Sequence, residues 1–327
     1  MSEFSLSAIN ERILESSKFV KPLRENLEKA VVGQEELLNK IIICMLADGH
    51  MLLEGVPGLA KTLTVKTLAS SLNSNFQRIQ FTPDMLPADL IGTLIYNQKS
   101  GEFDTRKGPI FSNVILADEI NRSPAKVQSA LLESMQEKQV TIGENTYKME
   151  LPFLVLATQN PLEQEGTYPL PEAQLDRFMF NVVIDYPPYE DEINIVKNNT
   201  SMASHTLSKI IDSKNLLEYQ KLVLNIPVSD NLIEYAVKLV HNTRPNHESS
   251  PDITKKYINW GAGPRASTYL ILAAKAKAVL SNKPTPDIDD IISVVKPVLR
   301  HRIIPNFNAE AEGIKRDDIL DELLESI

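Results

Sequence analysis

A glycine-containing loop of the type that binds phosphate constrains the fold of this chain more than any other feature of its sequence. The loop follows a short apolar run, His50 to Leu53, and leads into a helical pattern over Thr62 to Leu72. It reads Gly55-Val56-Pro57-Gly58-Leu59-Ala60-Lys61-Thr62, and Leu63 comes next in the helix. A strand, a loop and a helix in this order predict a nucleotide-binding unit within an α/β domain.

The residues of this loop supply the charges that a triphosphate needs. Backbone amides at the start of the helix and the Lys61 ammonium give positive potential for phosphate oxygens, and the Thr62 hydroxyl is a ligand for Mg²⁺. Ala60 stands where the second glycine of this motif is usual, and its methyl group restricts positive φ. The loop is therefore a less specific signal than the strict motif.

A second apolar run ends in two acids. Val114 to Ala117 has the composition of a buried parallel strand, and Asp118 and Glu119 follow it directly. At that position Asp118 can hold Mg²⁺ through water, while Glu119 can orient or deprotonate the attacking water. Two acids at an exposed strand end are common in isolation, but this pair follows a phosphate-binding loop, which favours nucleotide hydrolysis.

A polar amide follows a third apolar run. Phe153 to Ala157 leads into Thr158-Gln159-Asn160-Pro161. Ligands of open parallel sheets bind at the carboxyl ends of the strands, so we expect Asn160 to face the same crevice as Lys61 and Asp118. Taken by itself, an asparagine before a proline indicates only a turn.

Strands and helices alternate through the first part of the chain, which predicts a doubly wound α/β domain. Besides the three strands above, we predict strands at 181–184 and 77–81, and helices at 35–47 and 123–135. Ser123 is the expected N-cap of the latter helix, with Pro124 in its first turn. Hairpins are predicted around the turns at 97–101 and 143–145, as insertions into the core.

Strand patterns stop after the two prolines at 187–188, and the rest of the chain reads as helices. The predicted helices cover 190–198, 207–224, 229–242, 267–280 and 288–299. We expect a helical lead over residues 1–30, an α/β core over 31–188 and a C-terminal all-α lid domain over 189–327. The tail after Pro305 is acidic and is expected to be loosely held.

Composition limits the classes of partner. The chain has 327 residues, a net charge of −9 and a pI near 5.2, so it has no excess of cations for a nucleic-acid backbone. The first residues lack the basic start and apolar run of a secretory signal, and no long apolar stretch follows, which favours a cytoplasmic protein. Cys44 lies in an apolar run, as a buried structural thiol does. The five histidines show no zinc-ligand spacing.

The order of these parts resembles that of AAA+ ATPases, and several stretches resemble the MoxR family specifically. Two further motifs belong to this resemblance: Gln174 to Phe178, before the last core strand, and Gly261 to Ala266, which opens a helix of the second domain. The MoxR-like stretches are 55–62, 81–87, 108–111, 117–122, 131–135 and 157–161. The resemblance covers roughly residues 31–307.

This resemblance implies roles for several residues. Asn160 corresponds to sensor 1, Arg177 to the arginine finger and Arg265 to sensor 2, while Val32 and Gly33 lie near adenine. Pro264 starts the helix that carries Arg265, so the guanidinium has a rigid base from which to reach a γ-phosphate when the lid closes. The two predicted hairpins match the helix-2 and pre-sensor insertions of that clade.

The resemblance also implies an activity and partners. A MoxR-like ATPase converts ATP to ADP and phosphate with Mg²⁺ and remodels or assembles a protein client, in some cases one with a von Willebrand factor A domain. An arginine finger that acts in trans requires a neighbouring copy of the chain, and a ring, expected to be a hexamer, supplies one.

Several alternatives remain open from the residues alone. Arg177 could form a surface salt bridge with Asp176 or Glu172 instead of acting as a finger, and Arg122 is a rival finger. A nucleic-acid motor of the helicase type is the main alternative function, although the charge balance disfavours it. A GTP-dependent switch lacks the aspartate that guanine recognition needs, and a non-hydrolysing scaffold would not need the intact acids and lysine.

Overall fold

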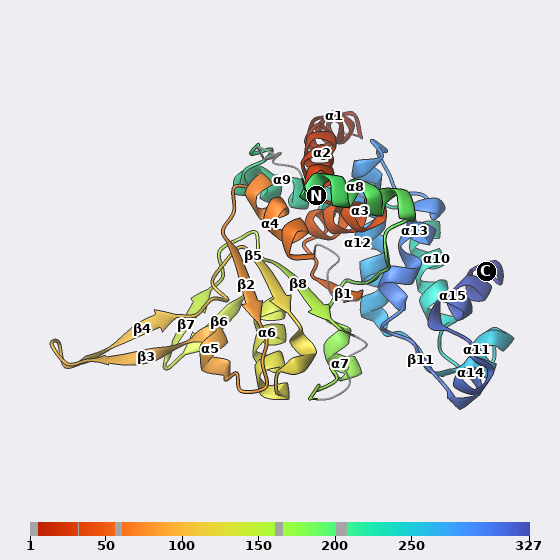
Figure 1. Cartoon of the computed structure of the whole chain (residues 1–327). Coiled ribbons are helices and arrows are strands. Elements are labelled where there is room, and N and C mark those ends of the chain that lie inside the picture. The colour runs from red at the N-terminus through yellow and green to blue at the C-terminus, as the bar shows by residue number, and fades with distance from the viewer. Residues whose placement is uncertain (1–5, 32, 56–60, 161–165, 201–207) are drawn as a thin grey trace.

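The chain is described here from a computed structural model (Figure 1), which covers residues 6–31, 33–55, 61–160, 166–200 and 208–327. A parallel five-stranded sheet forms its centre, in the order β2-β5-β8-β1-β9. The strands are β1 (Met51–Gly55), β2 (Phe76–Gln80), β5 (Val114–Asp118), β8 (Leu154–Gln159) and β9 (Phe180–Ile184). The predicted α/β core and its strands are confirmed.

Strands β1, β5, β8 and β9 are largely buried, which explains why they read as apolar runs, whereas β2 at one edge of the sheet is largely exposed. Along β1, Met51 and Leu53 belong to one apolar cluster, while Leu52 between them belongs to a second. The first cluster includes α3 (Glu35–Leu46) and α4 (Lys61–Ser71), and the second includes α6 (Ala125–Glu137). Because side chains alternate between the two faces of a strand, they pack against two separate layers of helices.

Helices before the core pack onto it. The chain begins with α1 (Leu6–Ser17) and α2 (Val20–Ala30), and α2 lies against α4. The side chains of Leu23 and Leu27 are fully buried. This lead is therefore part of the packed structure.

The predicted cap of α6 is wrong. The Ser123 hydroxyl donates a hydrogen bond to the Ile120 carbonyl at 3.2 Å, within the short 3-10 helix η1 (Ile120–Arg122), and Pro124 occupies the N-cap position. The tight turn after Glu119 brings a carbonyl acceptor within reach of the serine, so its hydroxyl is not free to cap the next helix.

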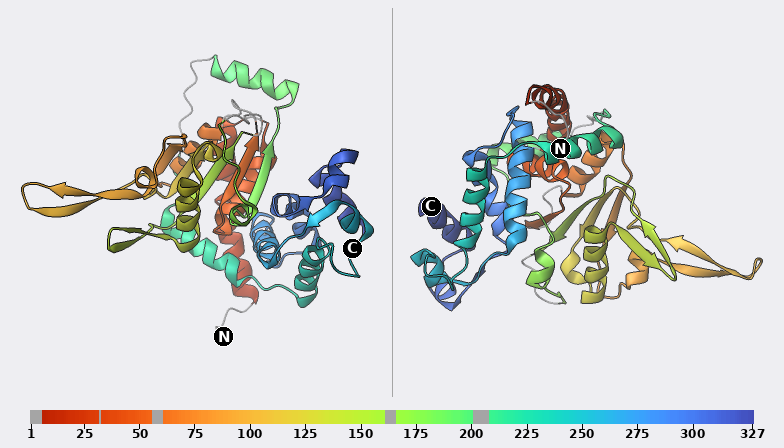
Figure 2. Two further views of the ribbon diagram at one scale, coloured as in Figure 1. Left: turned by 90° about the horizontal axis from the view of Figure 1, so that it is seen from below. Right: turned by 180° about the vertical axis from the view of Figure 1, so that it is seen from behind.

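Two hairpins are inserted into the core, as predicted. The first is β3 (Gly92–Asn97) with β4 (Glu102–Lys107), which follows the short helix α5 (Pro87–Ile91), and the second is β6 (Gln139–Ile142) with β7 (Asn145–Lys148). A 2.8 Å hydrogen bond between the Thr105 and Tyr147 hydroxyls links them. The first hairpin extends away from the sheet on the side opposite the C-terminal helices (Figures 1 and 2).

The C-terminal part is helical, and its helices from α10 to α15 lie together at one side of the sheet (Figure 2). Its helices are α8 (Tyr189–Asn199), α9 (Ser213–Asn225), α10 (Asp230–His241), α11 (Asp252–Tyr257), α12 (Pro264–Leu280), α13 (Ile288–Leu299), α14 (Phe307–Glu312) and α15 (Arg316–Glu325). The short helix α7 (Glu172–Leu175) precedes β9 in the core. The prediction of a C-terminal helical domain is confirmed.

Three details of the lid differ from the sequence-based expectation. The helix predicted over 207–224 begins only at Ser213, because the Asp212 carboxylate accepts a 2.7 Å hydrogen bond from the Asn215 amide and caps it. A small antiparallel pair, β10 (Ile258–Trp260) with β11 (Ile304–Pro305), was not predicted, since each strand is too short to show a period.

The third difference concerns the tail after Pro305. It forms α14 and α15, and α15 buries the side chains of Ile319, Leu320 and Leu323 completely. These three residues lie on one face of the helix, among acidic residues that remain exposed. The acidic composition therefore concealed an amphipathic helix, and the expectation of a loosely held tail is wrong.

Other expectations from composition concern single groups. Cys44 is buried, and burial raises the pKa of its thiol, as expected of an inert structural cysteine. Within the described ranges, no helix has both the length and the apolarity that a bilayer crossing requires.

Candidate active site

Lys61 stands at the first position of α4, and the loop 56–60 separates it from the end of β1. Its ammonium donates a 2.6 Å hydrogen bond to the Gly55 carbonyl. Burial lowers the pKa of Lys61, and the negative charges of Asp118 and Glu119 oppose that shift. The lysine therefore shares one electrostatic environment with both acids, as the sequence predicted. Residues 56–60 of the loop lie outside the described residues.

Gly55 is needed for close packing at this point. A Cβ atom built on Gly55 would lie 2.6 Å from the Ile184 carbonyl oxygen, a distance that real Cβ atoms do not reach. The glycine thus allows the end of β1 to lie against the end of β9 just before the phosphate-binding loop. In the first turn of α4, Thr62 is partly exposed and Leu63 is exposed.

Asp118 is held by two neighbouring strands. The Thr158 hydroxyl on β8 donates to Asp118 Oδ1 at 2.7 Å and accepts the Glu119 amide at 2.9 Å. On the other side, Arg78 of β2 donates to Asp118 Oδ2 through Nε at 3.0 Å and Nη2 at 2.6 Å. These hydrogen bonds hold both oxygens of the carboxylate in a fixed orientation.

Glu119 adopts the left-handed backbone conformation, with φ of 56° and ψ of 50°. This conformation costs a residue with a side chain on the order of 1 kcal/mol or more, and it is found often at functional positions. Its carboxylate accepts hydrogen bonds from Gln80 Nε2 at 2.8 Å and from Arg122 Nη1 at 3.2 Å. The Glu119 carboxylate is thus held beside the carboxyl end of β2.

Arg78, Gln80 and Thr158 were not predicted as members of this site. Arg78 and Gln80 are two residues apart on β2, so they share one face, and the register pairs Gln80 with Asp118. Polar side chains alternating through 77–81 were a signal, but the order of strands in the sheet was needed to read it.

The oxygen donors at this edge suit Mg²⁺, which prefers hydroxyl, carboxylate, phosphate and water ligands. Thr62 lies at the start of α4, and the Asp118 carboxylate has 17% of its side chain exposed. Among the described residues there is no group of three or more His, Cys, Asp or Glu side chains placed to hold a metal. A magnesium ion at this position would therefore depend on nucleotide phosphates and water for its remaining ligands.

Two other residues expected near nucleotide, Asn160 and Gly33, are described in the structure. Asn160 follows the end of β8 and is 8% exposed. Gly33 has a φ of 76°, and a Cβ atom there would lie 2.4 Å from the Asp191 carboxylate of α8. Val32 lies outside the described residues.

Arg177 lies at the other end of the sheet. It precedes β9, which runs parallel to β1 with Phe180 beside Met51 and Ile184 beside Gly55. At about 3.3 Å per residue, these two levels are roughly 13 Å apart along the strand. The segment 176–179 is thus at the amino end of β1, whereas Lys61 follows its carboxyl end.

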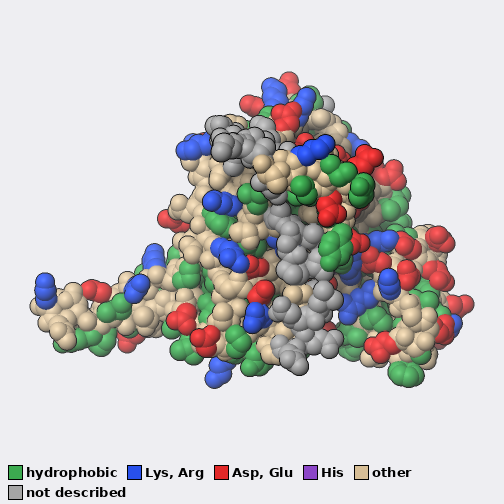
Figure 3. All heavy atoms as spheres, in the orientation of Figure 1, with side chains coloured by type: hydrophobic (Ala, Val, Ile, Leu, Met, Phe, Trp, Pro, Cys, Tyr) green, Lys and Arg blue, Asp and Glu red, His purple; other side chains and the backbone are tan. Residues whose placement is uncertain are grey.

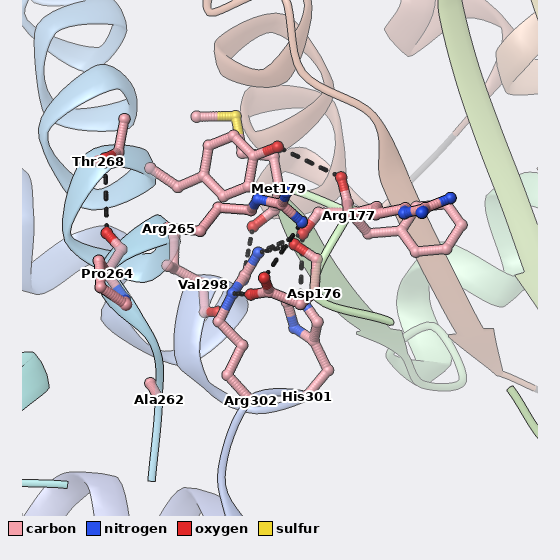
Figure 4. A network of polar contacts seen from close by, with 12 residues as sticks. Asp176, Arg177, Met179, Ala262, Pro264, Arg265, Thr268, Val298, His301 and Arg302 are labelled. Carbon is pink, nitrogen blue, oxygen red and sulfur yellow. Dashed lines mark hydrogen bonds and ion pairs between the residues drawn. The ribbon is translucent and has the colours of Figure 1, made fainter. Parts of the chain in front are cut away.

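Asp176 is the centre of a polar network at this far end (Figure 4). Its carboxylate accepts Arg302 Nε at 2.8 Å on one oxygen and pairs with Arg265 Nη1 at 3.1 Å on the other. Arg265 is in the first turn of α12, as predicted, but it binds Asp176 in this structure. Arg302 was not predicted, because 126 residues separate it from Asp176.

Arg177 and Arg122 each had an alternative role in the sequence-based predictions. Within the described residues, no ion pair joins Arg177 to Asp176 or Glu172, because Asp176 binds Arg265 and Arg302 instead. The salt-bridge alternative for Arg177 is therefore wrong in this structure. Arg122, the rival finger, binds Glu119 of its own chain.

Comparison with known proteins agrees with this architecture. Residues 50–180 match the model of the ATPase family associated with various cellular activities (AAA), and residues 251–323 match the AAA lid domain. Chaperone MoxR1 of Mycobacterium tuberculosis is 44% identical over 301 residues, which cover 92% of this chain and 80% of that protein. Protein MoxR of Methylorubrum extorquens is 27% identical, covering 92% and 91% of the two chains.

A solved structure extends the likeness to the whole fold. The crystal structure of a candidate ATPase from Cytophaga hutchinsonii is 48% identical, with a TM-score of 0.91 and coverage of 98% of both chains. The sequence motifs, the two domains and these relatives lead to one conclusion: the chain belongs to the MoxR family of AAA ATPases.

Proposed function

We propose that this protein hydrolyses ATP to ADP and phosphate with Mg²⁺ and uses the cycle to remodel or assemble a protein client, as a chaperone. The observation that carries the proposal is the position of Asp118 and Glu119 at the end of β5, close enough to Lys61 to influence its pKa. This is the arrangement that phosphoryl transfer to water requires: a cation for the phosphates and a base for the water.

Each residue of the site has a proposed task. Lys61 and the amides of 55–62 bind the phosphates, and Thr62 and Asp118 hold Mg²⁺, which neutralises charge on the phosphate oxygens when bound. Glu119 orients or deprotonates the attacking water, and Asn160 helps to place that water or the γ-phosphate. Val32, Gly33 and Leu63 are proposed to lie near the nucleotide.

Glu119 must change partners to act as a base. Gln80 and Arg122 both donate hydrogen bonds to its Oε2 atom, so this oxygen is not available to a water molecule in this arrangement. We propose that nucleotide binding moves these partners, so that the base is released only when a substrate is present.

The second half of the site is proposed to come from a neighbouring copy. Arg177 precedes β9, at the opposite end of β1 from Lys61, so it cannot join the phosphates of its own chain without leaving its place. A ring, which we propose to be a hexamer, would bring Arg177 to the neighbour's phosphates, and Arg265 would accompany it or exchange Asp176 for phosphate oxygens. The proposed division is a lead at 1–30, a core at 31–188 and a lid at 189–327.

The client is proposed to be a protein. A relative 44% identical to this chain is named chaperone MoxR1, and the hairpin β3–β4 exposes apolar side chains, including Tyr96 and Phe103, that a polypeptide could contact. A protein with a von Willebrand factor A domain is one class of client that the family resemblance implies.

A client trap would test this proposal. Purified protein should hydrolyse ATP in the presence of Mg²⁺, and Glu119→Gln protein loaded with ATP should retain a client that Lys61→Ala protein does not retain. Absence of Mg²⁺-dependent hydrolysis by the wild-type ring would refute the proposed activity, and equal recovery of the same proteins by both variants would refute the trapped client.

A nucleic-acid motor is the second candidate function. A Holliday junction branch migration subunit, RuvB of Phytoplasma mali, is 26% identical over 63% of this chain. Against this reading, the net charge is −9, and acidic side chains gather over the C-terminal helices α14 and α15 (Figure 3). Stimulation of hydrolysis by single- or double-stranded DNA would favour the motor.

A further inference from the structure

Three lid side chains, Tyr269, His301 and Arg302, form what we call the lid clamp. They bind four successive backbone carbonyls of the core, those of residues 176–179, directly before β9 (Figure 4). Arg302 donates to the carbonyls of 176, 178 and 179 at 2.8, 2.6 and 3.3 Å. Tyr269 donates to that of 177 at 3.3 Å, and the His301 ring nitrogen Nε2 lies 3.0 Å from that of 178.

Arg302 is the strongest element of the clamp. Only 2% of its side chain is exposed, and its guanidinium also binds the Asp176 carboxylate and the Val298 carbonyl and lies 5.1 Å from the centre of the Tyr269 ring. A buried guanidinium cannot replace these partners with water, so displacing the lid from this segment would leave a charge unpaired. The segment that follows α13 and residues 176–179 are therefore held tightly together.

The residue with its backbone in the middle of the clamp is Arg177. The lid fixes the carbonyls on both sides of it, while its side chain is directed away from Asp176 and Arg302 (Figure 4). Asp176, its immediate neighbour, also binds Arg265. The lid thus fixes the backbone position of Arg177 and, with it, the direction in which the Arg177 side chain can extend.

We propose that Arg302 is a positioning residue: through the lid clamp it sets Arg177 for catalysis in the neighbouring subunit's site. This inference rests on the proposed function, in which Arg177 acts in trans. It adds that the lid of one subunit controls hydrolysis in the next, because lid and Arg177 segment form one body. Lid movement driven by nucleotide in one subunit would then change the rate in its neighbour.

The variants that test this are Arg302→Lys and Tyr269→Phe. Lysine keeps a positive charge but cannot bind three carbonyls and a carboxylate at once. Phenylalanine keeps the ring beside Arg302 and removes only the hydroxyl that binds Arg177, so it tests the clamp even if Arg302→Lys fails to fold. The matched control is Arg300→Lys, since Arg300 binds Asp317 and the Asn181 carbonyl but not residues 176–179.

Uniform rings give the first readout. Arg302→Lys should lower kcat about tenfold with KM for ATP changed by less than about twofold, because the phosphate-binding loop is untouched. Tyr269→Phe should lower kcat by about two- to threefold in the same pattern, and Arg300→Lys should leave both constants within about twofold of the wild type. A rise in KM equal to the loss of kcat in both clamp variants would overturn the proposal.

Mixed rings give the deciding readout. Arg302→Lys subunits mixed with Lys61→Ala subunits should regain activity, because each intact Lys61 site beside a Lys61→Ala subunit receives a correctly placed Arg177. Mixed with Arg177→Ala subunits they should regain none. No recovery with Lys61→Ala, when Arg177→Ala subunits do recover with the same partner, would overturn the clamp but leave the trans role of Arg177. Failure of Arg177→Ala itself to recover would overturn both.

Discussion

The two ends of the central sheet are built in different ways. At the carboxyl ends, Asp118 and Glu119 are held by side chains that remain in contact with solvent: 48% of Arg78 and 43% of Arg122 are exposed. At the amino end of β9, residues 176–179 are held by Arg302, of which 2% is exposed. The first end can exchange its partners for water and phosphate, whereas the second cannot do so cheaply.

This difference suggests that the two ends have different tasks: one binds the ligand and the other positions a side chain. The exchangeable end carries the groups that must bind a ligand and change protonation or partners during turnover. The buried end carries Arg177, whose backbone must be held in place if its side chain is to reach a neighbour's site. If the proposed trans role of Arg177 holds, one chain presents halves of two active sites, separated by the length of β1.

The largest expected effect on hydrolysis comes from removing the proposed base at the carboxyl end of the sheet. Glu119→Gln should bind ATP normally and lower kcat by about 10²- to 10⁴-fold, because the amide keeps the shape of the side chain and loses its basicity. ATP binding by titration calorimetry and steady-state hydrolysis measure the two quantities. Glu133→Gln, an exposed glutamate on α6, is the control and should change neither.

Lys61→Ala should fail differently. It removes a cation from the β- and γ-phosphates, so tight ATP binding should be lost along with hydrolysis, and the remaining donors are backbone amides. The same calorimetry checks this expectation. If Glu119→Gln and Lys61→Ala lose nucleotide affinity equally, the division of tasks at this end of the sheet is wrong.

At the other end, Arg177→Ala should reduce hydrolysis by a factor on the order of 10³ while ATP binding is retained. The guanidinium is expected to stabilise charge that develops on the transferred phosphoryl group, and it makes no contribution to the phosphate-binding loop of its own chain. Single-turnover hydrolysis at saturating ATP measures the effect. Arg106→Ala, an exposed arginine on the β3–β4 hairpin, is the control.

The amino end of the sheet should also make the stability of the protein depend on pH, because a histidine is buried there. His50 is buried there, where Nδ1 accepts the Val155 amide at 3.1 Å and Nε2 donates to the Met135 carbonyl at 3.2 Å. Burial lowers the pKa of His50 from 6.5 to about 4, so the folded protein keeps the ring neutral. Its contribution to stability is complete above pH 6.5 and is lost as the pH falls toward 4.

Over that window the free energy of unfolding should fall by up to about 1.4 kcal/mol per pH unit for this one proton. Urea unfolding between pH 7.5 and pH 4.5 measures the slope. His50→Gln should reduce the slope by about one proton, and the exposed His247→Gln should not. An unchanged slope in the His50 variant would show that the ring is protonated in the folded state.

The smallest effect on basal hydrolysis is expected from the hairpins, which lie away from both ends of the site. Tyr147→Ala removes the hydroxyl bond to Thr105 and the ring beside Phe111. It should leave basal ATPase activity within about twofold of the wild type and weaken action on a client. If basal activity collapses while circular dichroism shows an intact fold, the hairpin belongs to the active site.

The carboxyl end of the sheet could be predicted because its signals are local. Asp118 ends its own apolar strand, Asn160 comes directly after one, and Lys61 follows one across the glycine-containing loop. These residues could therefore be selected without knowing how the strands are arranged. Arg78 and Gln80 lie on another strand, and only the order β2-β5 shows that they face the acids.

The amino end could not be predicted in the same way. Asp176 and Arg302 meet across 126 residues, and nothing in the sequence near either of them indicates the other. The tail was misjudged for a related reason, since the partners of Ile319 and Leu323 lie in other helices. Local patterns therefore gave the elements and the chemistry, while the contacts between domains required the structure.

The central claim is that Arg177 completes the site of the neighbouring subunit, and mixing two inactive proteins tests it most directly. Arg177→Ala subunits keep an intact Lys61 site, and Lys61→Ala subunits keep an intact Arg177. Hydrolysis should be near zero for either protein alone and should rise to a maximum at an intermediate ratio, where interfaces join the two intact halves. With mixed rings confirmed by native mass spectrometry, no recovery at any ratio would contradict the claim and leave Arg177 a role within its own chain.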